Sequence, residues 1–107
     1  MRVVTLNLNG IRSAASKGAF EWLATQDADV ICLQETRAQE QQLAGHPVDV
    51  PGYHRFFYAA QRKGYAGVAL YTRSKPDRVL RGFGVAEFDA EGRFIEAQFG
   101  DISVVSL

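Results

Sequence analysis

A strand, a helix and a second strand follow one another within residues 2–33, and this order constrains the fold more than any other feature. Residues 2–7 (RVVTLN) are rich in β-branched side chains and predict a strand. The stretch from Ala14 to Gln26 predicts one helix, with Ser13 as its N-cap. Residues 27–33 carry a continuous apolar core, which is typical of a strand buried on both faces. A βαβ unit this short predicts parallel strands joined by a right-handed crossover.

Beyond Glu35 the apolar runs recur at the spacing of β-hairpins. Residues 39–43 predict a short helix, and turns are predicted at Pro51-Gly52, Glu91-Gly92 and Gly100-Asp101. The strands expected between these breaks span residues 54–60, 67–72, 78–83, 94–99 and 102–107. No internal repeat or linker interrupts the chain. The sequence therefore predicts one α/β unit whose single mixed sheet starts with βαβ and continues with antiparallel strands.

The cellular setting is predicted from the N-terminus and from the one cysteine. Cys32 lies in an apolar run and has no partner for an intrachain disulfide. The chain enters its first strand without the regions of a secretory signal, and no apolar run approaches the ~18 residues that span a bilayer. We therefore expect a cytoplasmic protein that does not interact with membranes. Residues 102–107 end inside a predicted strand, so we expect the C-terminus to be a truncation.

Charge is unevenly distributed along a chain whose formal net charge is zero. A zero net charge counts weakly against a nucleic-acid-binding protein, because most such proteins carry a positive excess. Residues 55–82, however, carry seven basic side chains and one acidic side chain. This block could face a polyanion such as nucleic acid. It could equally be the solvated surface of a hairpin, and charge alone does not separate the two.

Two polar residues follow the two predicted parallel strands at the same end. Asn7 closes the first strand, and Glu35 follows the second. In open sheets, ligands bind outside the carboxyl ends of parallel strands. An amide oxygen and a carboxylate at that edge are hard ligands suited to Mg²⁺ or Mn²⁺, and Mg²⁺ typically takes only one or two protein carboxylates. The alternative is that Asn7 makes a turn and Glu35 caps the next segment.

Four segments of the chain resemble, in the same order, motifs of the exonuclease III family of abasic-site endonucleases. Asn7–Arg12 (NLNGIR) is similar to its N-x-N-G-(I/L)-R segment, and Leu33–Arg37 (LQETR) to its L-Q-E-T-K segment. Gly64–Arg73 (GYAGVALYTR) is similar to its G-Y-x-G-V-x-L strand, and Glu91–Ala97 (EGRFIEA) to its E-G-R-x-I-x-A-E region. Each segment alone is a weak signal. Together they cover essentially the whole chain, and the resemblance rests on all four.

The resemblance implies roles for individual residues. Glu35 matches the family's metal-binding glutamate, and Asn7 matches the asparagine of the metal site and its hydrogen-bond network. Asn9 and Arg37 match positions beside the metal ligands; the family usually has Lys at the latter, so Arg37 keeps the charge but changes the donor geometry. The positions that touch the DNA backbone in the family are Arg12, Lys17, Tyr65 and Arg93. Each of these four also has an ordinary alternative, as a solvated charge, a half-buried hairpin residue or a partner of a neighbouring glutamate.

The fold that the resemblance implies is the N-terminal portion of the four-layer α/β/β/α sandwich shared with deoxyribonuclease I. Residues 1–107 would then be part of a single endonuclease/exonuclease/phosphatase domain. The implied activity of the complete protein is hydrolysis of DNA phosphodiesters 5′ to abasic sites, with 3′-to-5′ exonuclease action in base excision repair. Mg²⁺, with Mn²⁺ as the alternative, is the implied cofactor. The implied partner is double-stranded DNA with abasic sites, bound by a monomer.

The family's remaining catalytic residues come from its later half. They are an Asp that orients the nucleophile, an Asn beside it, a further metal-site Asp and an Asp-His pair. We therefore expect residues 1–107 alone to be inactive and to supply one of the family's two sheets. We also expect strand 67–72 to be exposed on the face that the rest of the protein would cover.

Two other classes of function stay open. One is another phosphoesterase of the same superfamily, such as a phosphoinositide phosphatase or a sphingomyelinase. The segments QETR and NGIR argue against it, and product analysis on abasic DNA and on phospholipid separates the two. The other is a non-catalytic module or fragment, which a reading frame that stops at Leu107 would support.

Overall fold

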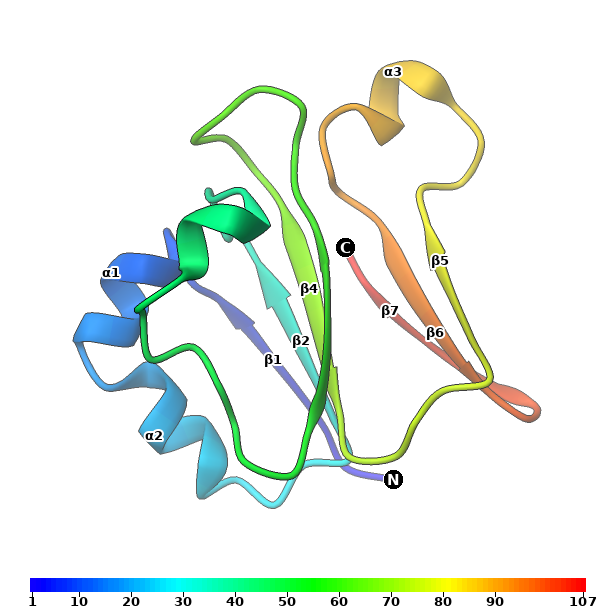
Figure 1. Cartoon of the computed structure of the whole chain (residues 1–107). Helices are drawn as coiled ribbons and strands as arrows, with labels where there is room; N and C mark the ends of the chain where they lie inside the picture. Colours follow the sequence, from blue (N-terminus) through cyan, green and yellow to red (C-terminus); the bar gives the residue numbers. More distant parts are fainter.

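Two β-sheets pack face to face, and helices cover the outer face of the first sheet (Figure 1). This arrangement is seen in a computed structural model that describes residues 1–107. The first sheet is mixed and contains, in spatial order, β1 (Val3–Asn7), β2 (Val30–Gln34), β4 (Val68–Thr72) and β3 (His54–Tyr58). The second is antiparallel and contains β5 (Arg78–Arg81), β6 (Ile95–Phe99) and β7 (Ile102–Ser106). The α/β class and the mixed sheet are confirmed.

The predicted βαβ unit is formed by β1 and β2. The two strands are parallel, with Val3 opposite Val30 and Asn7 opposite Gln34, so their carboxyl ends meet at one edge of the sheet. A parallel pair requires a crossover connection. Here it runs through α1 (Ile11–Ser16) and α2 (Ala19–Ala24), which lie against the same face of the sheet (Figure 1).

The single helix predicted over residues 14–26 was wrong, because this segment folds as two short helices. Gly18 separates them in a left-handed conformation, with a φ of +88° that glycine adopts at little cost. Beyond this break, Phe20 and Leu23 of α2 are both buried in the core. Ser13 is not an N-cap, because α1 begins earlier and Ser13 lies inside it.

Two short elements lie outside this unit. Residues Glu40–Leu43 form the 3₁₀ helix η1, close to the helix predicted over 39–43, and the side chains of Gln39 and Gln42 cap it reciprocally. The single turn α3 (Ala86–Asp89), between β5 and β6, was not predicted. It is stabilised by its Asp89 carboxylate, which accepts backbone N–H groups from the preceding loop, a contact that hydrophobic periodicity does not register. None of the helices has the length and apolar character needed to cross a bilayer.

The side chains of β2 and β4 alternate between two hydrophobic cores. Toward the helices, Leu33 and Tyr71 belong to the larger core. Toward the second sheet, Cys32 and Leu70 belong to the smaller core. Burial of β2 on both faces, which its continuous apolar run predicted, is confirmed. The expected exposure of strand 67–72 was wrong, because helices and the second sheet of this same chain bury β4 along its whole length.

The later strands were expected to continue a single sheet, but β5, β6 and β7 form a second one. β4 pairs with β2 on one side and with β3 on the other, so neither of its edges is free to accept β5. The chain crosses to the other layer through residues 73–77. Asp77 fixes this crossing, since its N–H donates to Gln98 O at 2.8 Å and its carboxylate accepts the Gly100 N–H at 2.7 Å. The chain therefore contributes strands to two sheets and not to one.

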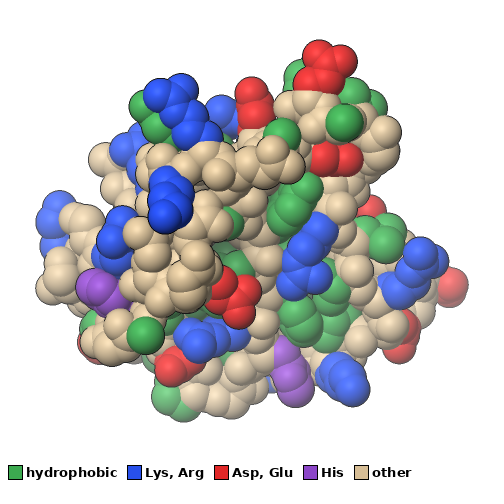
Figure 2. Space-filling model, turned by 45° about the horizontal axis from the view of Figure 1, so that its top comes forward, with side chains coloured by type: hydrophobic (Ala, Val, Ile, Leu, Met, Phe, Trp, Pro, Cys, Tyr) green, Lys and Arg blue, Asp and Glu red, His purple; other side chains and the backbone are tan.

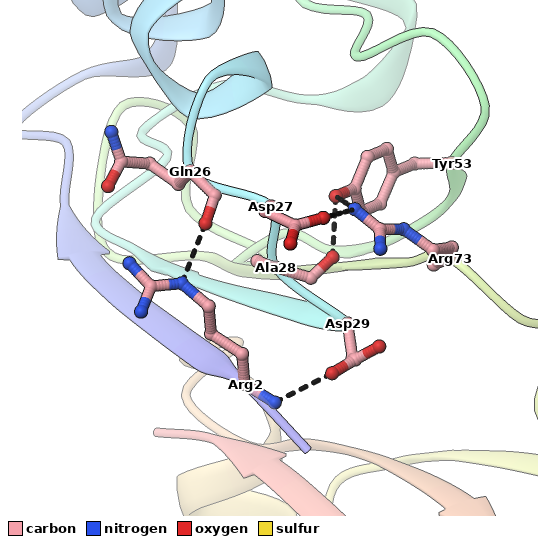
Figure 3. Close-up of polar contacts among 7 residues, drawn as sticks. All are labelled: Arg2, Gln26, Asp27, Ala28, Asp29, Tyr53 and Arg73. Carbon is pink, nitrogen blue, oxygen red and sulfur yellow. Dashed lines mark hydrogen bonds and ion pairs between the residues drawn. The ribbon is translucent and has the colours of Figure 1, made fainter.

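Polar contacts at the amino end of β2 fasten the helical layer to the first sheet (Figure 3). Arg2 donates its backbone N–H to Asp29 Oδ2 and its Nε–H to the Gln26 carbonyl, both at 2.6 Å. Arg73, which follows β4, donates to Asp27 Oδ1 at 3.0 Å. These contacts hold the loop between α2 and β2 at the edge of the sheet opposite to the one where β1 and β2 end.

At that other edge, backbone pairing between β2 and β4 continues past the ends of both strands. The Thr36 N–H donates to Gly67 O at 3.1 Å, and the Arg37 N–H donates to Ala66 O at 2.8 Å. Gly67 approaches so closely that a Cβ on it would lie 2.2 Å from Thr36 Oγ1, and its φ is +88°. Because Thr36 is 3% exposed, it has little room to move aside. The close contact between the two loops therefore requires glycine at position 67.

Replacing Gly67 should destabilise the protein more than replacing a glycine with the same backbone conformation in open space. Gly64 provides that control, with a φ of +81° and no atom within 4 Å of its Cβ position. In the complete protein, Gly64→Ala should cost about 1 kcal/mol for the left-handed backbone alone. Gly67→Ala should cost about 3 kcal/mol, because overpacking against Thr36 is added. Equilibrium unfolding in urea measures the free energy of unfolding of both variants. Equal losses of stability would show that Thr36 moves aside at no cost.

Cys32 is expected to resist alkylation in the folded protein. It is 3% exposed, and burial raises the pKa of its thiol to about 11. A raised pKa favours the neutral thiol, so little of the reactive thiolate is present at about pH 8. Peptide mass spectrometry of the complete protein after iodoacetamide treatment should find Cys32 unmodified when folded and modified in guanidinium. Rapid modification of the folded protein would contradict this burial.

Candidate active site

The segments that follow β1 and β2 stay hydrogen-bonded to each other beyond the strands. The backbone N–H groups of Leu8, Gly10 and Ile11 donate to the carbonyls of Gln34, Glu35 and Thr36, at 2.9, 2.8 and 2.9 Å. This pairing runs from the end of β1 to the start of α1. It brings the side chains of Asn7 and Glu35 together at the carboxyl edge of the sheet.

The amide of Asn7 links two parts of this site. Its Nδ2–H donates to Glu35 Oε2 at 2.5 Å, and its Oδ1 accepts the backbone N–H of Asn9 at 3.0 Å. Asn9 has a left-handed φ of +48°, which asparagine adopts more readily than most residues. In this geometry Asn9 orients Asn7, and Asn7 orients the carboxylate of Glu35. Direct contact between Asn7 and a metal ion stays a prediction.

Glu35 presents a carboxylate with a hydrogen bond on each oxygen. Its Oε1 accepts from Arg37 Nη2 at 2.6 Å, while Asn7 donates to Oε2. The hydrogen bond from Asn7 is the main reason that the pKa of Glu35 lies below its usual range; partial desolvation opposes this shift, and the charge of Arg37 adds to it. Glu35 is therefore ionised at neutral pH. Each carboxylate oxygen has a second lone-pair site, so both can still bind a cation.

Two adjoining pockets open beside Glu35 and extend toward the second sheet. One, of about 240 Å³, is lined by Asn7, Glu35 and Arg93 and by residues from β2, β4 and the end of the chain, among them Gln34 and Leu107. The other, of about 550 Å³, is lined by Glu35, Arg37, Tyr65 and Arg93. The structure thus places Tyr65 and Arg93 at the same site as Glu35, although Tyr65 comes from the β3–β4 loop and Arg93 from the segment before β6.

The other two residues predicted to contact DNA lie outside the pockets that contain Glu35. Arg12 is exposed on the first turn of α1, just after the backbone contact between α1 and the segment that follows β2. Lys17 lines a separate groove of about 380 Å³, which also contains Asn9. Neither residue lines the two pockets that contain Glu35. Their contacts with DNA stay predictions.

Arg93 also forms the ion pair that was its alternative role. Its Nε donates to Glu91 Oε2 at 2.6 Å, yet the Arg93 side chain remains 60% exposed. The turn that carries it is packed against the β3–β4 loop, since a Cβ on Gly92 would lie 2.6 Å from the backbone of both Ala59 and Ala60. The ion pair and the packed turn together hold the guanidinium at the pocket.

Four residues of the site were not identified from the sequence: Gln34, Thr36, Arg62 and Gly92. Gln34 ties the end of β2 to β7, because its Nε2 donates to the hydroxyl of Ser106 at 3.0 Å. Gln34, Thr36 and Gly92 lie within the quoted motifs, so the motifs themselves would have allowed these three to be identified. Arg62 had no such signal beyond its place in the basic block. Its guanidinium carbon lies 4.1 Å from the centre of the Tyr65 ring.

The chemistry of the donor set suits a hard divalent cation. The structure contains no group of three or more His, Cys, Asp or Glu side chains that could hold a metal ion. One ionised carboxylate beside an open pocket is nevertheless what Mg²⁺ uses, because this ion keeps several waters and takes its other ligands from substrate phosphate. Basic side chains gather on the upper left of the face in Figure 2, and acidic ones at its upper right. A polyanion would therefore be attracted to one part of this face.

Known proteins resemble this chain over nearly its whole length. Residues 4–107 match the Endonuclease/Exonuclease/phosphatase family. An exodeoxyribonuclease of Bacillus subtilis (strain 168) is 39% identical over 108 aligned residues, which cover 100% of this chain and 42% of that protein. DNA repair nuclease APEX1 of Danio rerio is 35% identical, with 99% of this chain and 35% of that protein covered. The chain thus spans less than half the length of these curated relatives.

Solved structures show the same architecture. An AP endonuclease from Archaeoglobus fulgidus has a TM-score of 0.81 and 30% identity, covering 98% of this chain and 39% of that chain. The 3′ phosphatase NExo from Neisseria, bound to a product DNA hairpin, has a TM-score of 0.80 and 26% identity, covering 98% of this chain and 40% of that chain. Because the family match extends over residues 4–107 and includes the whole site, this chain belongs to the Endonuclease/Exonuclease/phosphatase family.

Proposed function

We propose that the complete protein is a Mg²⁺-dependent nuclease that hydrolyses DNA phosphodiesters 5′ to abasic sites and also removes nucleotides in the 3′-to-5′ direction. The observation that carries the proposal is the carboxylate of Glu35, which Asn7 and Arg37 hold at a pocket shared with Tyr65 and Arg93. The relatives named as exodeoxyribonuclease and AP endonuclease, which match 98% or more of this chain, support the choice of substrate.

Each residue of the site has a separate task in this proposal. Glu35 would hold Mg²⁺, or Mn²⁺ as the alternative. When bound, the ion supplies positive charge beside the phosphate that is cleaved. Asn7 and Arg37 keep the carboxylate oriented and keep its pKa low, so it remains charged at neutral and mildly acidic pH. Arg93 adds a cation with exposed donors next to Glu35.

Recognition of DNA would rest on its backbone. An abasic site has no base to read, so a protein that finds it depends on backbone position and deformability. Cationic side chains at the carboxyl edge of the first sheet, such as Arg12 and Arg93, suit contacts with phosphates. The exposed ring of Tyr65 adds a surface that can pack against deoxyribose.

The role of Glu35 is tested by Glu35→Gln in the complete protein. Glutamine keeps the shape but loses the charge, so cleavage of an abasic duplex in Mg²⁺ should fall by at least about a hundredfold. The side chain is partly exposed, and the free energy of unfolding should change by less than about 0.5 kcal/mol. Single-turnover cleavage and urea unfolding measure the two effects.

Glu21→Gln is the matched control, because it makes the same chemical change at an exposed position of α2 outside the site. It should cleave like the unmodified protein. Near-normal cleavage by Glu35→Gln at saturating Mg²⁺ would overturn the metal role. Faster release of headgroup from a phosphoinositide or sphingomyelin than cleavage of abasic DNA would overturn the choice of substrate.

Arg12→Ala in the complete protein should weaken DNA binding to the same extent on every flanking sequence. Loss of one phosphate contact should also make the plot of log affinity against log salt shallower by about one unit of slope. Lys75→Ala removes the same charge at an exposed position after β4, at the opposite edge of the sheet, and should leave the slope unchanged. Fluorescence anisotropy with labelled abasic duplexes measures both. A loss that depends on flanking sequence would indicate contact with bases.

A further inference from the structure

We propose that Arg62 binds a backbone phosphate of the DNA substrate and that the ring of Tyr65 holds its guanidinium ready to do so. The two side chains form a stacked pair, with the guanidinium carbon 4.1 Å from the ring centre. The inference rests on the proposed nuclease function and adds a binding residue to it. No motif in the sequence marks Arg62.

The stacked arrangement leaves the hydrogen-bond donors of Arg62 available. A guanidinium lies on an aromatic ring by its flat face, and its five N–H donors point outward in the plane of the group. No carboxylate pairs with Arg62, in contrast to the ion-paired arginines Arg37, Arg55, Arg73 and Arg93. Phosphate is the ligand that such a fork recognises, through two parallel charge-assisted hydrogen bonds.

The loop that carries this pair is anchored on both sides. It joins β3 to β4 and rises beyond the end of the sheet (Figure 1). Toward the 3₁₀ helix η1, the Gln39 side chain donates from Nε2 to Ala60 O at 2.7 Å. Toward the second sheet, Gln61 N–H donates to Ala90 O at 2.9 Å. An anchored loop with a stacked side chain loses less conformational entropy on binding than two free side chains would.

The Arg62–Tyr65 pair lies beside the pocket that contains Glu35. Tyr65 lines the pocket of about 550 Å³ that contains Glu35. Tyr65 also lines a second pocket of about 170 Å³, together with Arg62 and Arg93. Tyr65 and Arg93 line both pockets, so the pocket that contains Arg62 adjoins the one that contains Glu35. A DNA strand with one phosphate at Glu35 would bring a neighbouring phosphate of its backbone toward Arg62.

The test is binding of a labelled abasic duplex by the complete protein in EDTA, where metal-dependent cleavage does not interfere. Arg62→Ala should weaken binding by about tenfold, as expected for loss of a charge-assisted contact. It should also flatten the salt dependence by about one unit of slope. Lys63→Ala is the matched control, since it removes an adjacent exposed cation that makes no aromatic contact, and it should stay within about twofold of the unmodified protein. Arg62→Lys keeps the charge but not the planar fork, so it should keep the slope and lose part of the affinity.

The orienting role of Tyr65 is tested by a double-mutant cycle. If the ring positions the guanidinium, Arg62→Ala and Tyr65→Ala should be non-additive, because each removes part of the same contact. Tyr65→Phe keeps the ring, so Arg62→Ala should weaken binding as much in this background as it does in the unmodified protein. Additive losses would overturn the coupling and would leave the two residues as separate contacts.

The outcomes also separate this inference from the function on which it rests. If the unmodified protein does not bind abasic duplex, the proposed function itself fails. If it binds, and Arg62→Ala binds as tightly as Lys63→Ala, only the role of Arg62 fails. Arg62 and Lys63 are both exposed, so neither substitution should change the free energy of unfolding. Urea unfolding of each variant checks this and separates a loss of binding from a loss of the fold.

Discussion

Backbone hydrogen bonds hold the segment Glu35–Arg37 from both sides, and the geometry of the candidate site depends on this double attachment. The start of α1 donates to its carbonyls, and its own N–H groups donate to the loop before β4. Glu35 and Arg37 both have left-handed φ values of +52°, a conformation that persists only where the surroundings impose it. Thr36, buried between them, provides that constraint. With the backbone held, the hydrogen bonds from Asn7 and Arg37 only have to orient one carboxylate.

The second sheet completes the site because β2 and β4 are buried on both faces. On that side Leu70 of β4 packs against β6 and Cys32 of β2 lies against β7, so the second sheet is held at a set distance from the first. The segment just before β6 carries Arg93, and this packing brings it beside Glu35. Gln34 adds a polar link between the sheets through Ser106. The same hydrophobic packing that stabilises the fold therefore assembles the charged residues of the pocket.

Much of the architecture follows from local patterns. The strands lie close to their predicted positions, and β1 and β2 are parallel, because β-branched runs and continuous apolar runs register directly in short windows of sequence. The helix after β1 was predicted wrongly, since one glycine, Gly18, divides an otherwise helical pattern. The division into two sheets was also missed. Whether β5 pairs with β4 depends on β3 already occupying that edge, and no local pattern contains this information.

The sequence by itself determined which side chains can carry the chemistry and that Asn7 and Glu35 end neighbouring strands, because ionisation, donor type and strand direction are properties of single residues and short segments. Only the tertiary structure decided that Tyr65 and Arg93 meet Glu35 from different sheets, and that Arg62 stacks on Tyr65 with its donors free. The physical reason is that sheet packing depends on apolar area buried across many residues that are distant in sequence. Contacts between loops on two sheets therefore depend on the total buried apolar area, which no single segment of the sequence determines.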